Sequence, residues 1–196
     1  MDSDGGPTAS PLVSIQYSTA KTRIITTALE LFSQHGIGGT SLQMIADEIG
    51  VTKAAVYHQF KTKDEIVVAA VEVELARLEP ALDLAEADDQ RPRALTLLLT
   101  QVIDLAVEHR RMVVTLQHDP VVVRLLAEHE PFQLFMGRLF HALTGGENSA
   151  EARVRAAMIS MAIGGAVSHP LVAGLDDGTL RSQLLLLTWR FLDLPE

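Results

Sequence analysis

The stretch GTSLQMIADEIGVTKAAVYHQF, residues 39–60, decides the fold of this chain. Its apolar residues recur at helical spacing, stop at Gly50 and resume at a different phase, which predicts two short helices joined by a tight turn. Ala46 is small enough to let the second helix cross closely, and Gly50 can adopt the left-handed conformation of such a turn. Val56 then packs the second helix on the first. The spacing of these three residues predicts a helix-turn-helix.

The second helix of the pair leaves one face free for polar contacts. Its side chains are short or hydrogen-bonding, as in helices that enter the DNA major groove with their N-terminus at the base edges. They belong to Thr52, Lys53, Ala54, Tyr57 and His58. An ordinary helical hairpin with a solvated face would carry the same pattern of small and apolar residues, so the motif alone leaves both interpretations open. The exposed ring of Tyr57 and the nearby Lys61 and Lys63 favour DNA, because such residues contact phosphates.

Helical periodicity continues on both sides of this motif. A helix is predicted over residues 19–36, and a fourth helix begins near Thr62 and is expected to kink or end at Pro80. Residues that can cap helix starts are Thr40-Ser41, Thr52 and Thr62. Further amphipathic segments cover residues 93–108, 121–129, 131–143, 150–168 and 180–192. No run alternates like a strand, so the sequence predicts an all-α protein of about nine helices.

The charge is unevenly divided along the chain. The 196 residues carry a net charge of −9, yet five basic and three acidic residues give the segment from Tyr17 to Lys63 a charge of +2, which leaves −11 for the rest. A slightly basic N-terminal unit on an acidic body is typical of a local phosphate-facing surface. We therefore expect a disordered tail over residues 1–16, a helix-turn-helix DNA-binding domain over 17–63 and a larger helical domain over 64–196.

Two features bear on location. The chain has no cysteine and its N-terminus lacks the basic and apolar regions of a signal peptide, so we expect a cytoplasmic protein. Residues 156–175 have about the ~20-residue length of a membrane span, but glycine, serine, His169 and Pro170 interrupt them. This segment predicts a buried helix that ends near His169 and Pro170, and no membrane contact.

The N-terminal residues as a set resemble the DNA-binding domain of TetR-family transcriptional regulators. The family frame is filled here by Ala28, Leu31, Phe32, Gly36, Thr40, Ile45, Ala46, Gly50, Val51, Tyr57, Phe60 and Lys63. The resemblance implies that Thr40, Tyr57 and Lys63 contact phosphates and that Thr52 and Lys53 meet the groove, and Ser41 joins this DNA-binding set. Gln59 stands where the family often has histidine, with His58 one position earlier.

The resemblance also assigns residues 64–196 as a ligand-binding and dimerisation domain. It implies a homodimer that pairs through the last two long helices, residues 150–168 and 180–192, which are apolar on more than one face. Candidate ligand-binding residues on the helices that enclose the family's pocket are Gln101, Met112, Leu116, His118, Phe132, Phe135, Met136, Met158 and Met161. Each apolar member is also a plain candidate for core packing. The lack of interior charge favours an apolar effector.

Other functions have little support in the sequence. The seven histidines include no pair at the spacing of a metal site on one helix, and no nucleophile, metalloprotease or phosphate-loop motif is present. We expect no enzyme activity, no catalytic residue, no cofactor and no metal. The sequence predicts a repressor that a small apolar effector releases from a palindromic double-stranded DNA operator. The alternative is a helical interaction protein without DNA binding.

Overall fold

A computed structural model of the protein describes residues 17–87, 91–110, 113 and 119–192. These residues form nine α-helices, one 3-10 turn and no strand, which confirms the all-α prediction. The helices are α1 (Thr19–Gly39), α2 (Leu42–Ile49), α3 (Lys53–Gln59), α4 (Lys63–Ala87), α5 (Arg91–Glu108), α7 (Pro120–Glu128), α8 (Glu130–Thr144), α9 (Ala150–Ser168) and α10 (Asp177–Leu192), with the turn η1 at Pro170–Val172.

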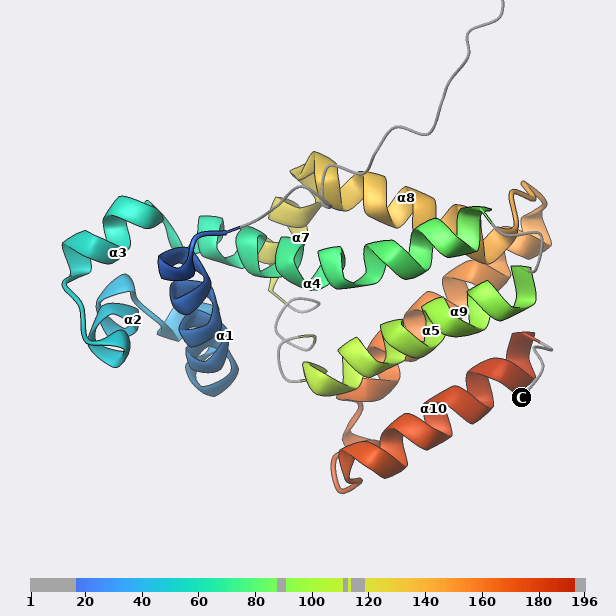
Figure 1. Ribbon diagram of the computed structural model, residues 1–196. Helices are drawn as coiled ribbons and strands as arrows, with labels where there is room; N and C mark the ends of the chain where they lie inside the picture. Colours follow the sequence, from blue (N-terminus) through green and yellow to red (C-terminus); the bar gives the residue numbers. More distant parts are fainter. Residues whose placement is uncertain (1–16, 88–90, 111–112, 114–118, 193–196) are drawn as a thin grey trace, which may run out of the picture.

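The helices form a small N-terminal group and a larger bundle (Figure 1). Helices α1, α2 and α3 pack on one another, and α4 runs from this group into the bundle, where it lies against α5, α7 and α8. Helix α5 also packs on α9 and α10, so it lies between α4 and the C-terminal helices. Helix α4 is therefore the main physical link between the two parts.

Three clusters of buried side chains hold this arrangement. The first joins α1, α2 and α3 to the start of α4 and to α7, and its innermost members include Ile45, Ala46 and Val56, all fully buried. The second lies between α4, α5 and α8, and the third between α5, α9 and α10. The first cluster continues along α4 as far as Val71. The domain division at residue 63 stays a prediction, and α4 contributes to the cores on both sides of it.

Side-chain caps begin the helices close to the predicted positions. The Ser41 hydroxyl accepts from the Met44 N–H at 3.2 Å at the start of α2, and Thr52 does the same for Ala55 at 3.2 Å at the start of α3. Thr62 accepts from Glu65 N–H at 3.1 Å before α4. Each cap contributes about 1 kcal/mol. Since α2 and α3 are short, these caps matter for the position of the surface that α3 presents.

The sequence predicts that α4 either kinks or ends at Pro80, and the helix does not end there. It continues through Ala87, because Leu78 and Leu82 on either side of the proline are buried against α5 and α8. Arg138 of α8 adds ion pairs on both sides of Pro80, to Glu79 at 2.5 Å and to Asp83 at 2.5 Å. This packing offsets the backbone hydrogen bond that proline removes.

Helix α9 ends where the sequence predicts. Its last residue is Ser168, and His169 caps the 3-10 turn that begins at Pro170 by accepting from Leu171 N–H at 3.2 Å. Within the described ranges, no helix is long and apolar enough to cross a membrane.

Candidate functional site: an exposed helix and an apolar pocket

The turn between α2 and α3 has the conformation that the motif requires. Gly50 is left-handed, with φ 70° and ψ 36°, and its N–H bonds to the carbonyls of Ala46 and Asp47 at the end of α2. Arg23 of α1 donates to the Ile49 carbonyl at 3.2 Å, which ties the same helix end to α1. Both contacts therefore hold the end of α2 at the point where the chain turns into α3.

Helix α3 presents the predicted face outward. Val56 is fully buried and Phe60 is 4% exposed, so these two side chains anchor the helix. All five predicted face residues are exposed, and the ring of Tyr57 is 52% exposed. The Lys53 side chain makes no hydrogen bond or ion pair with the described residues. The structure thus brings Thr52, Lys53, Ala54, Tyr57 and His58 to one accessible surface, which we call the α3 face.

Three other predicted DNA-binding residues have structural partners. Thr40 is 2% exposed and its hydroxyl donates to the Gly36 carbonyl at 2.8 Å, so in this conformation it offers no donor to a phosphate. Lys63 donates through Nζ to the Ile37 carbonyl at 2.7 Å, which joins the start of α4 to the end of α1. Ser41 is exposed, but its hydroxyl caps α2. Phosphate contacts by these side chains would require the present hydrogen bonds to change.

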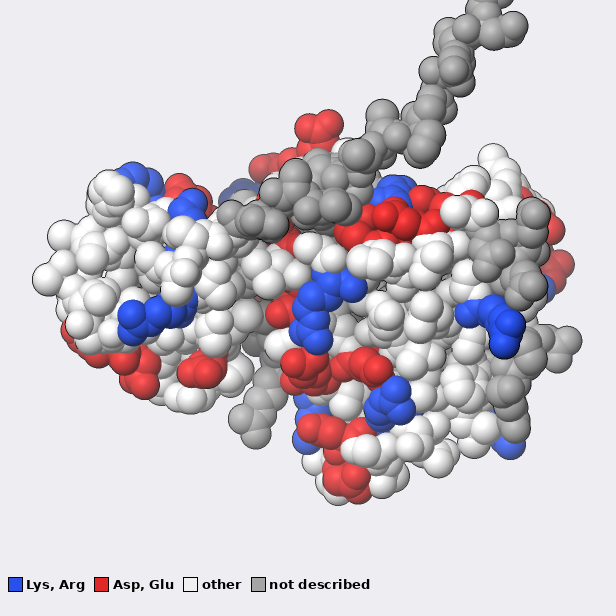
Figure 2. All heavy atoms as spheres, in the orientation of Figure 1, with Lys and Arg blue, Asp and Glu red and all other residues white. Residues whose placement is uncertain are grey.

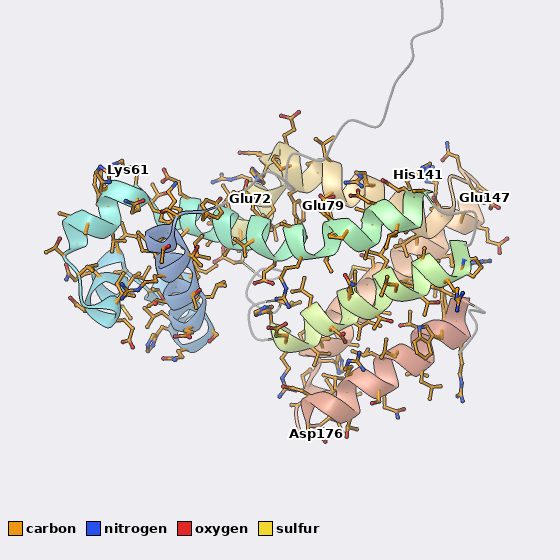
Figure 3. All side chains as sticks on the ribbon, viewed as in Figure 1. Lys61, Glu72, Glu79, His141, Glu147 and Asp176 are labelled. Atoms are coloured by element: carbon orange, nitrogen blue, oxygen red, sulfur yellow. The ribbon has the colours of Figure 1, made fainter. Side chains whose placement is uncertain are left out.

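Lys61 is a cation beside the α3 face. Its Nζ donates to the Tyr57 carbonyl at 2.9 Å and lies 4.6 Å from the centre of the Tyr57 ring, at the C-terminal end of α3 (Figure 3). Lys21 lies over the Phe60 ring at 5.1 Å in a similar way. Figure 2 shows scattered basic side chains on the N-terminal group, with acidic ones along its lower edge, and side chains of both signs on the larger bundle. The cations near α3 are therefore separate side chains and do not form a dense basic patch on this face.

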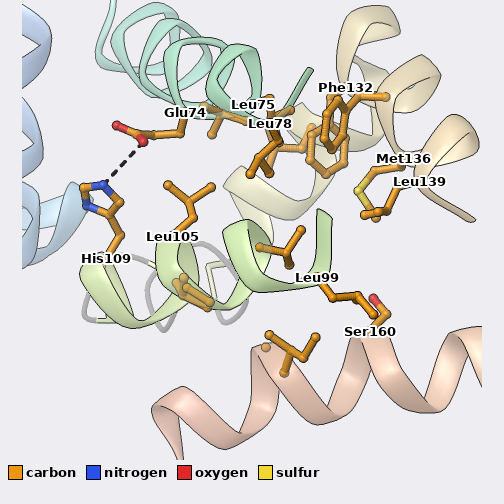
Figure 4. A pocket seen from close by; sticks show the side chains of 18 of the residues that line it. Glu74, Leu75, Leu78, Leu99, Leu105, His109, Phe132, Met136, Leu139 and Ser160 are labelled. Carbon is orange, nitrogen blue, oxygen red and sulfur yellow. Dashed lines mark ion pairs between the residues drawn. The ribbon is translucent and has the colours of Figure 1, made fainter. Parts of the chain in front are cut away.

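An apolar cavity of about 250 Å³ lies within the larger bundle, between α4, α5, α8 and α9 (Figure 4). Its volume is slightly below the roughly 300–1,000 Å³ of usual ligand pockets, so it suits a small molecule or one that extends beyond it. Three of the predicted ligand-binding residues line it: Phe132, Phe135 and Met136. Leucine, valine and isoleucine side chains of α4, α5, α8 and α9 form most of the remaining wall.

The other predicted ligand-binding residues lie elsewhere. Gln101 does not line the cavity, and Met158 and Met161 are 53% and 73% exposed on the outer side of α9. Helix α9 lines the cavity instead with Ile159, Ser160 and Ile163. One residue along an α-helix is a rotation of about 100°, so the methionines face away from the cavity. Met112, Leu116 and His118 lie outside the described residues.

Two polar residues at one end of the cavity were not among the sequence predictions. Glu74 of α4 and His109, directly after α5, both line it, and His109 Nε2 lies 3.4 Å from Glu74 Oε2. Their side chains are only 13% and 23% exposed. Arg77 also donates to Glu74, at 2.7 Å. A sequence signal for Glu74 exists, because it lies on the same helical face as Val71 and Leu78.

The pKa values of this pair shift in opposite directions. The nearby Glu74 carboxylate raises the pKa of His109 above its ordinary 6.5, although burial opposes the change. Burial alone would raise the pKa of Glu74, but the His109 ring beside it and the hydrogen bond from Arg77 outweigh this effect, and the pKa lies below its ordinary 4.5. Each group therefore favours the charged form of the other.

A strip of exposed apolar side chains follows α9 and α10. It consists of Val154, Met158 and Met161 on α9 and Leu187 and Phe191 on α10, with exposures from 47% to 73%. We call it the α9–α10 strip. Exposed apolar side chains that recur along one helix commonly mark an interaction site in a folded protein. These are the two helices through which the family resemblance implies dimerisation.

Comparison with known proteins agrees with the helix-turn-helix. A sequence model described as bacterial regulatory proteins, tetR family, matches residues 24–70. The uncharacterized HTH-type transcriptional regulator YerO of Bacillus subtilis is 42% identical over 52 residues, 26% of this chain and 18% of that protein. The regulator AcrR of Shigella flexneri is 49% identical over 43 residues, 22% of this chain and 20% of that protein. The chain thus aligns with about a fifth of the length of these relatives.

Solved structures resemble the whole fold. The KstR2 ketosteroid transcriptional regulator of Mycobacterium tuberculosis has a TM-score of 0.66 at 19% identity, covering 94% of this chain and 100% of that one. FadR of Bacillus subtilis in complex with stearoyl-CoA has a TM-score of 0.67 at 18% identity, covering 85% and 96%. The helix-turn-helix geometry and the family match on the residues that form it show that residues 24–70 are similar to the DNA-binding domain of tetR-family regulators, and the solved structures show that the whole chain shares the fold of such regulators.

Proposed function

We propose that the protein is a transcriptional repressor that binds a palindromic operator as a homodimer and is released by a small, largely apolar effector. The observation that carries the proposal is the α3 face, with Val56 anchored inside and Lys53 and Tyr57 outside. The family match covers the residues that build this face.

In this proposal α3 enters the major groove. Its N-terminal residues Thr52, Lys53 and Ala54 meet base edges, because recognition helices place their first turn there. Tyr57 and His58, further along, contact phosphates and fix the register. Lys61 at the end of α3 adds a cation on the phosphate side. A total charge of −9 disfavours nonspecific attraction to DNA, so binding would depend on these local contacts.

Pairing through the α9–α10 strip would bring two copies of α3 to one face of the DNA. A two-fold axis relates the two copies, so the operator would consist of inverted half-sites about 34–36 Å apart, one turn of the duplex. Burial of Met161, which is 73% exposed in the single chain, would contribute to the stability of the dimer.

The effector would act through α4. This helix lines the cavity with Leu75 and Leu78 and contributes Ile66 and Val67 to the core of the N-terminal group. A ligand that favours a shifted α4 would therefore change the separation of the two α3 helices and lower operator affinity. The FadR structure with stearoyl-CoA supports a ligand site in a protein of this fold.

Fluorescence anisotropy with labelled DNA from the region upstream of its own gene tests the function. We expect Lys53→Ala to weaken operator binding. It should also reduce the difference in binding free energy between the operator and unrelated DNA by about 1–3 kcal/mol. Arg155→Ala, on an exposed side chain of α9, is the matched control and should leave both unchanged. Absence of specific binding at low salt would favour the alternative, an interaction protein without DNA binding.

A further inference from the structure

The apolar cavity has a polar neighbour that touches the N-terminal group. A cleft of about 480 Å³ is lined by Thr26, Glu30 and Ser33 of α1, and by residues at the end of α5 and the start of α10. Glu74 and His109 line both the cavity and the cleft, so this pair is their shared wall. Figure 4 shows the pair at one end of the cavity, with α1 beyond it.

The shared wall is loosely closed. The His109 Nε2 atom is buried, and its 3.4 Å contact with Glu74 is too long and poorly aligned to count as a hydrogen bond. His109 directly follows α5, which ends at Glu108, and its side chain is 23% exposed and borders the open cleft. A ligand in the cavity could therefore pass its polar end between these side chains into the cleft.

The charges of the cleft are mainly negative. Four carboxylates line it, those of Glu30, Glu74, Glu108 and Asp177. Arg77 forms ion pairs with Glu74 at 2.7 Å and with Glu108 at 3.0 Å, and Arg110 forms an ion pair with Asp177 at 3.4 Å. The Glu30 carboxylate makes no hydrogen bond or ion pair with the described part of the chain. The two arginines thus form ion pairs with three of the carboxylates. Glu30 on α1 faces the cleft without an ion-pair partner among the described residues.

We propose that the effector is an amphipathic molecule with an apolar body in the cavity and a cationic head, such as an ammonium group, that passes the Glu74–His109 wall into the cleft. This inference rests on the proposed effector site. An anionic head would approach the Glu30 carboxylate, which has no ion-pair partner among the described residues, and like charges at close range repel. A cationic head would replace the loose contact of His109 with Glu74 and reach Glu30.

Such a head would touch the N-terminal group directly. Glu30 and Ser33 belong to α1, which packs on α2 and α3, whereas Glu74 and Glu108 belong to helices of the bundle. The ligand would therefore bridge α1 to α4 and α5. Its binding would bias how the two parts of the molecule are held together, and with that the position of α3.

Three probes with one apolar chain and different heads test the charge of the ligand: decylamine, decanol and decanoate, below their micelle concentrations. Isothermal titration of the full chain measures each affinity. We expect decylamine to bind roughly ten-fold more tightly than decanol, and decanoate more weakly than decanol. Added salt should weaken the binding of decylamine and leave the affinity for decanol unchanged, because screening acts only on the charged head.

Two variants test the position of the head. Glu30→Gln should lower the affinity for decylamine about two- to five-fold and leave the affinity for decanol unchanged, as expected for the loss of one partly solvated charge contact. Glu151→Gln, an exposed carboxylate of α9 outside the cleft, should change neither. Equal or tighter binding of decanol or decanoate, or an unchanged affinity of Glu30→Gln for decylamine, would overturn the cationic head while leaving an effector cavity. If none of the probes binds, both this inference and the proposed effector site fail.

Discussion

Substitution of Gly50 by alanine tests whether backbone conformation holds the helix-turn-helix together. A Cβ at this position would meet no atom within 4 Å, so the substitution causes no steric clash. The φ of 70° is nevertheless a left-handed conformation, which costs an L-residue with a Cβ about 1–2 kcal/mol. We therefore expect Gly50→Ala to lower the free energy of unfolding by about 1–2 kcal/mol.

Urea unfolding followed by circular dichroism measures this change. Gly38→Ala is the matched control, because Gly38 also has open space around it but no positive φ. Gly50→Asn should recover part of the loss, since asparagine tolerates the left-handed region. Equal stabilities of Gly50→Ala and Gly38→Ala would refute the reasoning, because the left-handed turn is the only difference that it invokes.

Three further predictions concern other parts of the molecule. Met161→Glu should yield a monomer in analytical ultracentrifugation, whereas Leu84→Glu, an exposed leucine of α4 outside the α9–α10 strip, should remain dimeric; a dimeric Met161→Glu would contradict the assigned interface. Lys63→Met should lower the free energy of unfolding by about 1 kcal/mol, because it leaves the Ile37 carbonyl without its charged donor, and unchanged stability in urea would show that the contact contributes little. His109 has a raised pKa, so its contribution to stability is complete below pH 6.5 and is lost as the pH rises through the pKa of the folded state. Glu74 has a lowered pKa, so its contribution to stability is complete above pH 4.5 and is lost as the pH falls through the pKa of the folded state. In thermal unfolding across this range, His109→Asn should therefore show less loss of stability above pH 6.5 than the original chain, and identical pH profiles would contradict the pairing.

The sequence predicted those features that depend on residues close together in the chain. The helix-turn-helix follows from Ala46, Gly50 and Val56, which lie within eleven residues and act through a turn and one helix crossing. The apolar pattern predicts a start of α10 at Leu180, three residues after its observed start at Asp177. Asp176 accepts a hydrogen bond from the Thr179 N–H at 2.9 Å and so caps the N-terminus of α10. The sequence Asp-Asp-Gly-Thr contains the signal for this cap.

Features built from distant residues could not be predicted in the same way. Glu74 and His109 are 35 positions apart, and only the packing of α4 on α5 brings them together. Lys63 was expected to face DNA, but its reach to Ile37 depends on how α1 ends against α4. The methionines of α9 fell on the wrong face for the cavity, because periodicity identifies two apolar faces of this helix and not which neighbour each one meets.

Selection of binding sites from random double-stranded DNA, followed by hydroxyl-radical footprinting, tests the central claim most directly. If α3 reads DNA in a two-fold dimer, the selected sequences will contain inverted half-sites with centres about one helical turn apart, and Lys53→Ala will lose the selected preference. Enrichment of no inverted repeat, or an identical preference in the Lys53→Ala protein, would contradict the claim that the α3 face recognises an operator.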